Sequence, residues 1–257
     1  PKVTDTYFTM LNFLTHKIVM IPVMLATGFS MAIIPAITKH YTQNKMLEVR
    51  AAMDKTYQVL LFITVPATIG ISILAKDLYH FFYSQSDMGT QVLGHYAPVA
   101  ILFALFTVTA AILQGVDYQK WVVFSLVTGV VVKAVLNIPL IKIWSVDGAI
   151  VATALGYGAT IIINIYVIKK ATSYKAKIVM RRILLIMMIT AIMAVTVWGT
   201  NLALYAIAPA DTKMLALLYS MICAIVGVVV YGGISYKLGL AQLLLGDKLD
   251  KILKKLR

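Results

Sequence analysis

Two lysines and an asparagine within or beside long apolar runs are the residues of this chain best suited to binding chemistry. Lys133 lies in the middle of one run, Asn137 follows it one helical turn later, and Lys17 directly precedes another run. A lysine at the centre of a membrane helix costs about 2.5–3.5 kcal/mol on insertion scales, so it needs a partner or a function. We expect Lys133 either to meet an anionic group or to hold helices together, with Asn137 helping to fix its ammonium. Lys17 fits the same binding role, and it also fits an interfacial lysine that extends its ammonium toward water.

The other chemically active residue types are placed unfavourably for catalysis. All ten acidic residues lie in predicted loops or at the ends of apolar runs, whereas a proton or sodium relay usually needs a carboxylate inside the membrane. The four histidines have no metal-ligand spacing, and no nucleophile–histidine–acid or nucleotide-binding pattern occurs. The single cysteine, Cys223, excludes an internal disulfide and is expected to be a small packing residue. We therefore predict no catalytic site, no metal and no cofactor.

The elements that must position these residues are apolar helices. The chain is 61% hydrophobic and only 13% charged, which is too apolar for a soluble domain of 257 residues. Runs of about twenty apolar residues, each long enough to cross a bilayer, occur near 18–37, 57–75, 94–113, 121–143, 148–168, 183–205 and 214–236. The runs are continuous, unlike the alternating strands of a membrane barrel. The sequence thus predicts an all-α, polytopic membrane protein with seven transmembrane helices.

The positive charge of the chain follows the topology of these spans. With the loops 75–94, 142–147 and 209–213 placed outside, 17 of the 23 Lys and Arg residues lie inside and 5 lie outside, while Lys133 is within a span. This asymmetry is typical of the positive-inside rule. It puts the C-terminus in the cytoplasm, and it explains the net charge of +13 without a nucleic-acid partner.

Small and polar residues recur at four-residue steps in the fourth and fifth spans. The fourth carries Ser125, Gly129, Lys133 and Asn137, and the fifth carries Ala152, Gly156, Thr160 and Asn164. Because the connection between these spans is short, we expect antiparallel neighbours. Stripes of this kind let membrane helices approach closely, so packing is the first role we assign to them, with Lys133 as the exception.

The two ends of the chain lead to further expectations. Seven spans and a cytoplasmic C-terminus put the N-terminus outside, yet no signal peptide leads it there, so we expect at least one upstream span. Residues 237–257 form a basic amphipathic stretch whose leucines share one helical face, typical of a helix lying on the inner membrane surface. A frayed basic tail is the alternative.

Six short strings in the first two thirds of the chain resemble one transporter family. They are IPV at 21–23 with IPAIT at 34–38, PATIG at 66–70, TAAILQG at 109–115, KAVLNIPLI at 133–141 and GAIVAT at 148–153. In order and spacing they are similar to the polysaccharide-export and lipid II flippase branch of the multidrug/oligosaccharidyl-lipid/polysaccharide exporter superfamily. The likeness covers residues 17–170, and the last two spans match only in number.

The resemblance implies a fold and a site. The family has fourteen helices, so the seven spans here correspond to helices eight to fourteen, the C-terminal half. Residues 1–170 would hold helices eight to twelve of the second lobe, 171–236 the two additional helices, and 237–257 a cytoplasmic tail. A basic residue five positions before the first proline of helix eight faces the central cavity in lipid II flippases. Lys17 stands at that position relative to Pro22, where cell-wall members more often carry arginine.

The function implied is transport without covalent chemistry. We expect a flippase of the bacterial plasma membrane that moves a lipid-linked saccharide with an anionic pyrophosphate, first of all lipid II for peptidoglycan. Its partners would be this substrate, membrane lipids and the N-terminal half of the same protein. The alternatives are another polysaccharide, teichoic-acid-type or sporulation glycolipid exporter, and a drug/cation antiporter. A membrane-bound glycosyl- or acyltransferase would need a catalytic cluster that the loops lack, and a membrane scaffold would not need Lys17 and Lys133.

Overall fold

The computed structural model describes residues 14–83, 86–175, 177–210 and 212–240, and these are helical almost throughout. The described helices, in chain order, are α2 (His16–Thr42), α3 (Met46–Ile73), α4 (Ala75–Phe82), α5 (Asp87–Tyr96), α6 (Val99–Gly115), α7 (Gln119–Thr172), α8 (Lys177–Ile207) and α9 (Lys213–Lys237). The prediction of an all-α fold is confirmed.

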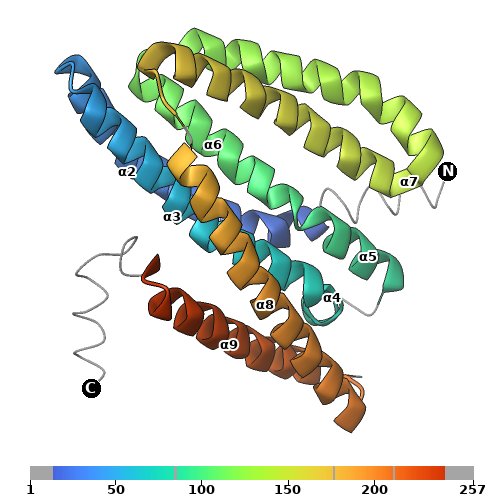
Figure 1. The fold of residues 1–257 in the computed structure, drawn as a ribbon. Coiled ribbons are helices and arrows are strands. Elements are labelled where there is room, and N and C mark those ends of the chain that lie inside the picture. The colour runs from blue at the N-terminus through green and yellow to red at the C-terminus, as the bar shows by residue number, and fades with distance from the viewer. Residues whose placement is uncertain (1–13, 84–85, 176, 211, 241–257) are drawn as a thin grey trace.

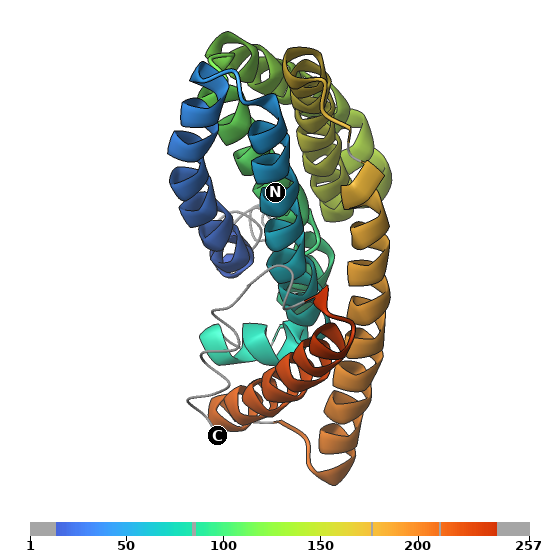
Figure 2. The ribbon, with the colours of Figure 1, turned by 60° about the vertical axis from the view of Figure 1, so that its left-hand side comes forward.

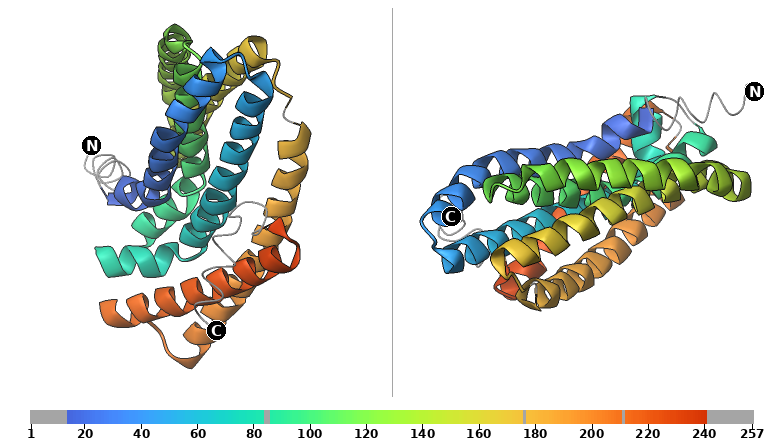
Figure 3. Two further views of the ribbon diagram at one scale, coloured as in Figure 1. Left: turned by 90° about the vertical axis from the view of Figure 1, so that its left-hand side faces the viewer. Right: turned by 90° about the horizontal axis from the view of Figure 1, so that it is seen from above.

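The long helices lie side by side and define two ends of the molecule. The turns that join α2 to α3, α6 to α7 and α7 to α8 gather at one end, and α4, α5 and the bend of α7 lie at the other (Figure 1). Helix α8 runs along α3, while α9 crosses α8 obliquely (Figure 2). Seen from above, α2, α6 and α7 extend alongside one another (Figure 3). The grouping of the connections at two ends agrees with the prediction, made from the positive charges, that successive loops lie on alternate sides of the membrane. Which end faces the cytoplasm stays a prediction.

Five helical segments of the described chain are long and apolar enough to cross a membrane. They are Met46–Ile73, Asp87–Gly115, Gln119–Thr172, Met180–Ile207 and Lys213–Lys237. The third has 54 residues and would measure about 81 Å if straight, far more than the roughly 30 Å of a bilayer core. It is in fact two arms, which match the predicted spans 121–143 and 148–168. The full count of seven spans, which also requires α2, stays a prediction.

The prolines inside the predicted spans have different effects on the helices. Helix α2 continues through Pro22 and Pro35, and α3 continues through Pro66. Pro98 instead stands at the break between α5 and α6, so the predicted third span is a helix in two segments. A proline lacks the N–H that would bond back to the preceding turn, which favours a break of this kind.

Two apolar clusters lie one toward each end, the first between α2, α3, α6 and α7 and the second between α2, α4, α5, α6 and α7. Met53, Ile112 and Ile168 belong to the first, and Val19, Tyr79 and Leu93 to the second. Tyr57 and Tyr96 are also buried, at 7% and 6% exposure, because they pack into these clusters. The division of the chain at residues 170 and 236 stays a prediction, and all but the first four residues of the predicted tail, 237–257, lie outside the described part.

Candidate functional site

Helix α7 folds back on itself at Ser145 and forms a tight helical hairpin. Ser145 has φ 52° and ψ −124°, a conformation that a residue with a side chain rarely adopts and that costs of order 1–3 kcal/mol. Close to this bend, a Cβ placed on Gly148 would lie 2.1 Å from the carbonyl oxygen of Leu140. The connection between the fourth and fifth spans is therefore a single sharp reversal, and the expectation of antiparallel neighbours is confirmed.

The two glycines of the predicted stripes meet at the crossing of the hairpin arms. A Cβ on Gly129 would lie 2.0 Å from Thr160 Oγ1 and 2.7 Å from the carbonyl oxygen of Gly156. A Cβ on Gly156 would in turn approach the Gly129 carbonyl to 2.7 Å. Without side chains at these positions the two backbones touch, which is the use that membrane helices make of small residues.

A buried network of polar side chains joins the hairpin to α6. The Ser125 hydroxyl donates to Asn164 Oδ1 at 2.6 Å, and Asn164 Nδ2 donates to Thr109 Oγ1 at 3.1 Å. Thr160 Oγ1 donates to the carbonyl oxygen of Ser125 at 3.1 Å. Exposure of these side chains is 0–2%, so the network satisfies polar groups that would otherwise be costly to bury. Sequence analysis missed Thr109, because a lone threonine on a third helix has no periodic signal.

Lys133 lies beside this network, in a small pocket between the hairpin arms. The pocket has a volume of about 130 Å³ and is lined by Thr153, Tyr157 and Thr160 as well as by Lys133. A Cβ on Gly156 would lie 3.0 Å from Lys133 Cβ, so the stem of the lysine lies against the opposite arm. Among the described residues Lys133 makes no ion pair, and its side chain is exposed.

Asn137 lies on the same arm, one turn closer to the bend. Its Oδ1 is buried and accepts no hydrogen bond from any described residue. The expected bond between Asn137 and the Lys133 ammonium is not formed among the described residues, because Asn137 Oδ1 has no donor there. An unpaired buried amide oxygen is an acceptor available to a ligand or to a further helix.

Lys17 is exposed in the first turn of α2, near one end of the molecule. The neighbouring His16 ring bonds the Tyr96 hydroxyl at 2.9 Å and stands edge-on to Phe103, with centroids 5.8 Å apart. The Phe103 ring also stands edge-on to the Tyr157 ring, with centroids 4.5 Å apart.

This aromatic chain links the surroundings of the two lysines. Tyr157 lines the Lys133 pocket, so these ring contacts lead from His16, the chain neighbour of Lys17, to that pocket. Lys17 and Lys133 thus belong to one region of the molecule, although they come from different helices. Their binding role, and that of Asn137, stays a prediction.

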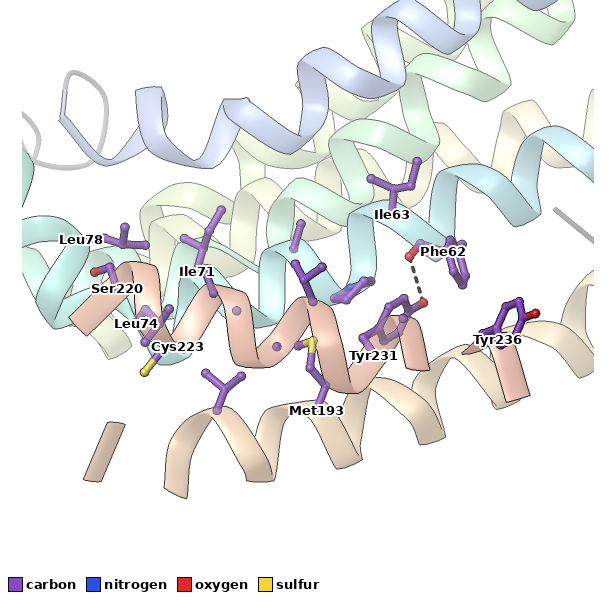
Figure 4. A pocket seen from close by; sticks show the side chains of 18 residues that line it. Phe62, Ile63, Ile71, Leu74, Leu78, Met193, Ser220, Cys223, Tyr231 and Tyr236 are labelled. Atoms are coloured by element: carbon purple, nitrogen blue, oxygen red, sulfur yellow. Dashed lines mark hydrogen bonds between the residues drawn. The ribbon is translucent and has the colours of Figure 1, made fainter. Parts of the chain in front are cut away.

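An apolar groove lies between α3, α8 and α9 (Figure 4). It has a volume of about 640 Å³, and its walls include Phe62, Met193 and Tyr231. The Tyr231 hydroxyl donates to the Phe62 carbonyl oxygen at 2.9 Å and so fixes α9 against α3. Cys223 lies in the wall and is fully buried, as expected of a packing residue.

One carboxylate is buried at the end of the molecule that carries α4. Asp77 is 1% exposed and accepts hydrogen bonds from Asn201 Nδ2 at 2.7 Å and from the Tyr205 hydroxyl. Sequence analysis placed Asp77 in a loop and missed this burial, because its partners follow more than 120 residues later. No group of three His, Cys, Asp or Glu side chains that could hold a metal ion occurs within the described ranges.

Long apolar helices that carry exposed lysines and an apolar groove are typical of membrane transporters, and comparison with known proteins gives the family. The family model described as lipid II flippase MurJ matches residues 10–214, so the chain belongs to this family. The lipid II flippase MurJ of Bacillus subtilis (strain 168) is 42% identical over 258 residues, covering 98% of this chain and 47% of that protein.

Two more distant similarities extend this result. The probable low-salt glycan biosynthesis flippase Agl15 of Haloferax volcanii is 21% identical over 62% of this chain and 34% of that protein. A solved structure of a lipid II flippase MurJ in an inward closed conformation matches with a TM-score of 0.61 at 14% identity, over 90% of this chain and half of that one. This likeness supports the fold. The chain spans about half the length, or less, of the curated relatives it matches.

Proposed function

We propose that this chain is the C-terminal half of a flippase that moves a lipid-linked saccharide across the bacterial plasma membrane, with lipid II as the first candidate. The observation that carries the proposal is the 42% identity, over nearly the whole chain, to a protein named as a lipid II flippase. The N-terminal half of the same protein, membrane lipids and the substrate would be its partners. We place the C-terminus in the cytoplasm.

The two lysines support an anionic substrate. Lys17 and Lys133 are exposed, and neither makes an ion pair among the described residues. A pyrophosphate that leaves water loses a large solvation energy, which unpaired cations inside the membrane would offset. We assign Lys17 to direct contact with the pyrophosphate. Lys133 and the free acceptor on Asn137 would line the same cavity.

The apolar groove of Figure 4 supports a long hydrocarbon tail. A polyprenyl chain would bury its surface there without any polar contact, at roughly 25 cal/mol per Å² of apolar area removed from water. Alternating access would move the polar head past the membrane core while the tail stays in an apolar environment. No covalent step is needed, so we propose a transporter rather than an enzyme.

Two related functions compete with this one. Similarity to a probable glycan biosynthesis flippase favours another glycolipid of the same chemistry, such as a teichoic-acid-type or sporulation precursor. A drug/cation antiporter would need an intramembrane carboxylate. Asp77 is buried, but two neutral donors already hold it at one end of the molecule. This arrangement favours a structural role for that carboxylate.

Growth complementation tests the proposal. The full-length protein would be expressed in a strain depleted of its own lipid II flippase, with membrane insertion checked by blotting. We expect growth to be restored. Failure of the correctly inserted protein to restore growth would contradict the lipid II assignment and favour one of the other glycolipids.

A further inference from the structure

A second apolar groove lies on the opposite face of α3 from the groove of Figure 4. Its wall on α3 is formed at four-residue steps by Tyr57, Leu61, Val65 and Ile69, which share one helical face. Helices α6, α7 and α8 supply the other walls. The volume is about 530 Å³, and almost all of the lining is hydrocarbon.

The length of this groove matches one leaflet of a bilayer. From Tyr57 to Ile69 the α3 axis rises roughly 18 Å at 1.5 Å per residue. Half of a hydrocarbon core of about 30 Å is about 15 Å. The groove begins near the turn between α7 and α8, at the end of the molecule that the charge pattern puts in the cytoplasm. It therefore extends to about the middle of the membrane.

Basic residues adjoin the lining of the groove along the chain, at the end where the groove opens. Lining residues and cations are immediate neighbours in the chain at three places: Tyr174 precedes Lys175, Met180 precedes Arg181, and Ile183 follows Arg182. At a fourth place Lys169 directly follows the lining residue Ile168, and Lys170 comes next. Lys175 and Arg181 are exposed.

Among the residues that the structure describes, these cations have almost no anionic partner. Asp54 is the acid at this site, and its Oδ1 already accepts a 2.6 Å hydrogen bond from the Tyr174 hydroxyl. Arg182 donates to the side chain of Gln58, a neutral group. The one ion pair found in the described ranges is His95–Asp147, at the other end of the molecule. The mouth therefore presents net positive charge at the level of lipid headgroups.

We propose that this groove binds one acyl chain of an anionic phospholipid of the inner leaflet, whose phosphate is held by Lys175 and Arg181. Exposed lysines and arginines beside a membrane attract anionic headgroups, and the groove adds apolar burial for the chain. A zwitterionic lipid would gain the apolar burial of its acyl chain but not the attraction between headgroup and cations. The site lies apart from Lys17, Lys133 and the first groove, so it goes beyond the proposed transport function.

Lipid binding to the purified full-length protein tests this site. Native mass spectrometry would compare retention of phosphatidylglycerol with that of phosphatidylcholine carrying the same acyl chains. We expect phosphatidylglycerol to bind at least about tenfold more tightly. The double variant Lys175→Gln/Arg181→Gln should lose most of this preference, and Ala191→Trp, which fills the groove, should weaken binding of both lipids. Ala191 lines the groove on α8.

Matched variants give the controls. Lys120→Gln removes a cation from the same end of the molecule but away from the groove, and Ala224→Trp fills the first groove instead. Neither should change phosphatidylglycerol binding. Equal binding of the two lipids, or equal losses in Lys120→Gln and in the double variant, would overturn the proposal. So would an unaffected Ala191→Trp variant, because the charges would then attract headgroups without an acyl-chain site. Transport is not measured, so these outcomes are independent of the substrate.

Discussion

The Ser125 hydroxyl donates a 2.6 Å hydrogen bond to Asn164 Oδ1 across the two arms of α7, with both residues fully buried. Asn164 then donates to Thr109 on α6, so one side chain connects three helical segments. This connection fixes the rotation of the hairpin that carries Lys133. The position of the candidate binding lysine thus depends on a polar network away from the lysine itself.

Replacing Asn164 should destabilise the protein. Asn164→Ala leaves Ser125 without its side-chain acceptor and Thr109 without a donor, at an expected cost of about 1–2 kcal/mol. Thermal unfolding of the full-length protein in detergent would measure the effect. Thr128→Ala is the control, since Thr128 lies near the surface and, among the described residues, bonds only the Phe124 carbonyl of its own helix. Equal midpoints for the two variants would contradict a structural role of the network.

Glycine at position 129 should be essential for closing the hairpin. In Gly129→Ala the new methyl would lie 2.0 Å from Thr160 Oγ1 and 2.7 Å from a backbone oxygen, so the arms must separate. We expect a loss of about 1–3 kcal/mol from this overpacking.

Gly158→Ala provides the comparison for that change, because nothing lies within 4 Å of its added Cβ. Alanine is also the better helix former by about 1 kcal/mol, so this variant should unfold at the same or a higher temperature. Opposite effects on the unfolding midpoint are therefore expected, and a tolerated Gly129→Ala would refute the close contact of the two backbones.

The buried carboxylate of Asp77 should fasten α8 to α4. Asp77→Asn removes the charge and presents an amide N–H₂ to donors that need an acceptor, so about 1–3 kcal/mol of stability should be lost. Hydrogen exchange should rise near Asn201 and Tyr205. Asp117→Asn changes an exposed acid in a turn and should have no measurable effect. Unchanged exchange near Asn201 in the Asp77 variant would disprove the fastening role.

Tyr174 should hold the α7–α8 connection against α3 over a wide pH range. Burial and the hydrogen bond to Asp54 keep the pKa of the Tyr174 hydroxyl well above its usual value near 10. The neutral hydroxyl is favoured by folding, so its contribution is complete below pH 10 and is lost only as the pH rises toward the folded-state pKa.

Tyr174→Phe should therefore lower the free energy of unfolding by about 1–2 kcal/mol, and the loss should be the same at pH 6 and pH 9. Unfolding midpoints at both pH values measure this, with Tyr166→Phe at an exposed position as the control. A difference between wild type and Tyr174→Phe that disappears between pH 6 and 9 would contradict the raised pKa, because the hydroxyl would then ionise below its usual range.

Local sequence patterns predicted much of this architecture. The apolar runs marked the helices, and the four-residue steps of Gly129 and Gly156 predicted which faces of the hairpin meet, because helical periodicity is encoded locally. The partners of Asn164 and Asp77 could not be found in this way, because a single threonine or tyrosine on a distant helix leaves no periodic trace. Asn137 was expected to hold Lys133, but its acceptor is unpaired in the described structure, since spacing along a helix does not fix side-chain direction.

Transport of lipid II in proteoliposomes tests the central claim most directly. The full-length protein would be reconstituted with fluorescent lipid II, and a membrane-impermeant quencher would report movement between leaflets. We predict translocation by wild type, a loss of about tenfold or more in Lys17→Ala, a smaller loss in Lys133→Ala, and wild-type rates in Lys120→Ala. Equal translocation by wild type and Lys17→Ala, at equal reconstitution, would contradict the assignment of Lys17 to the substrate.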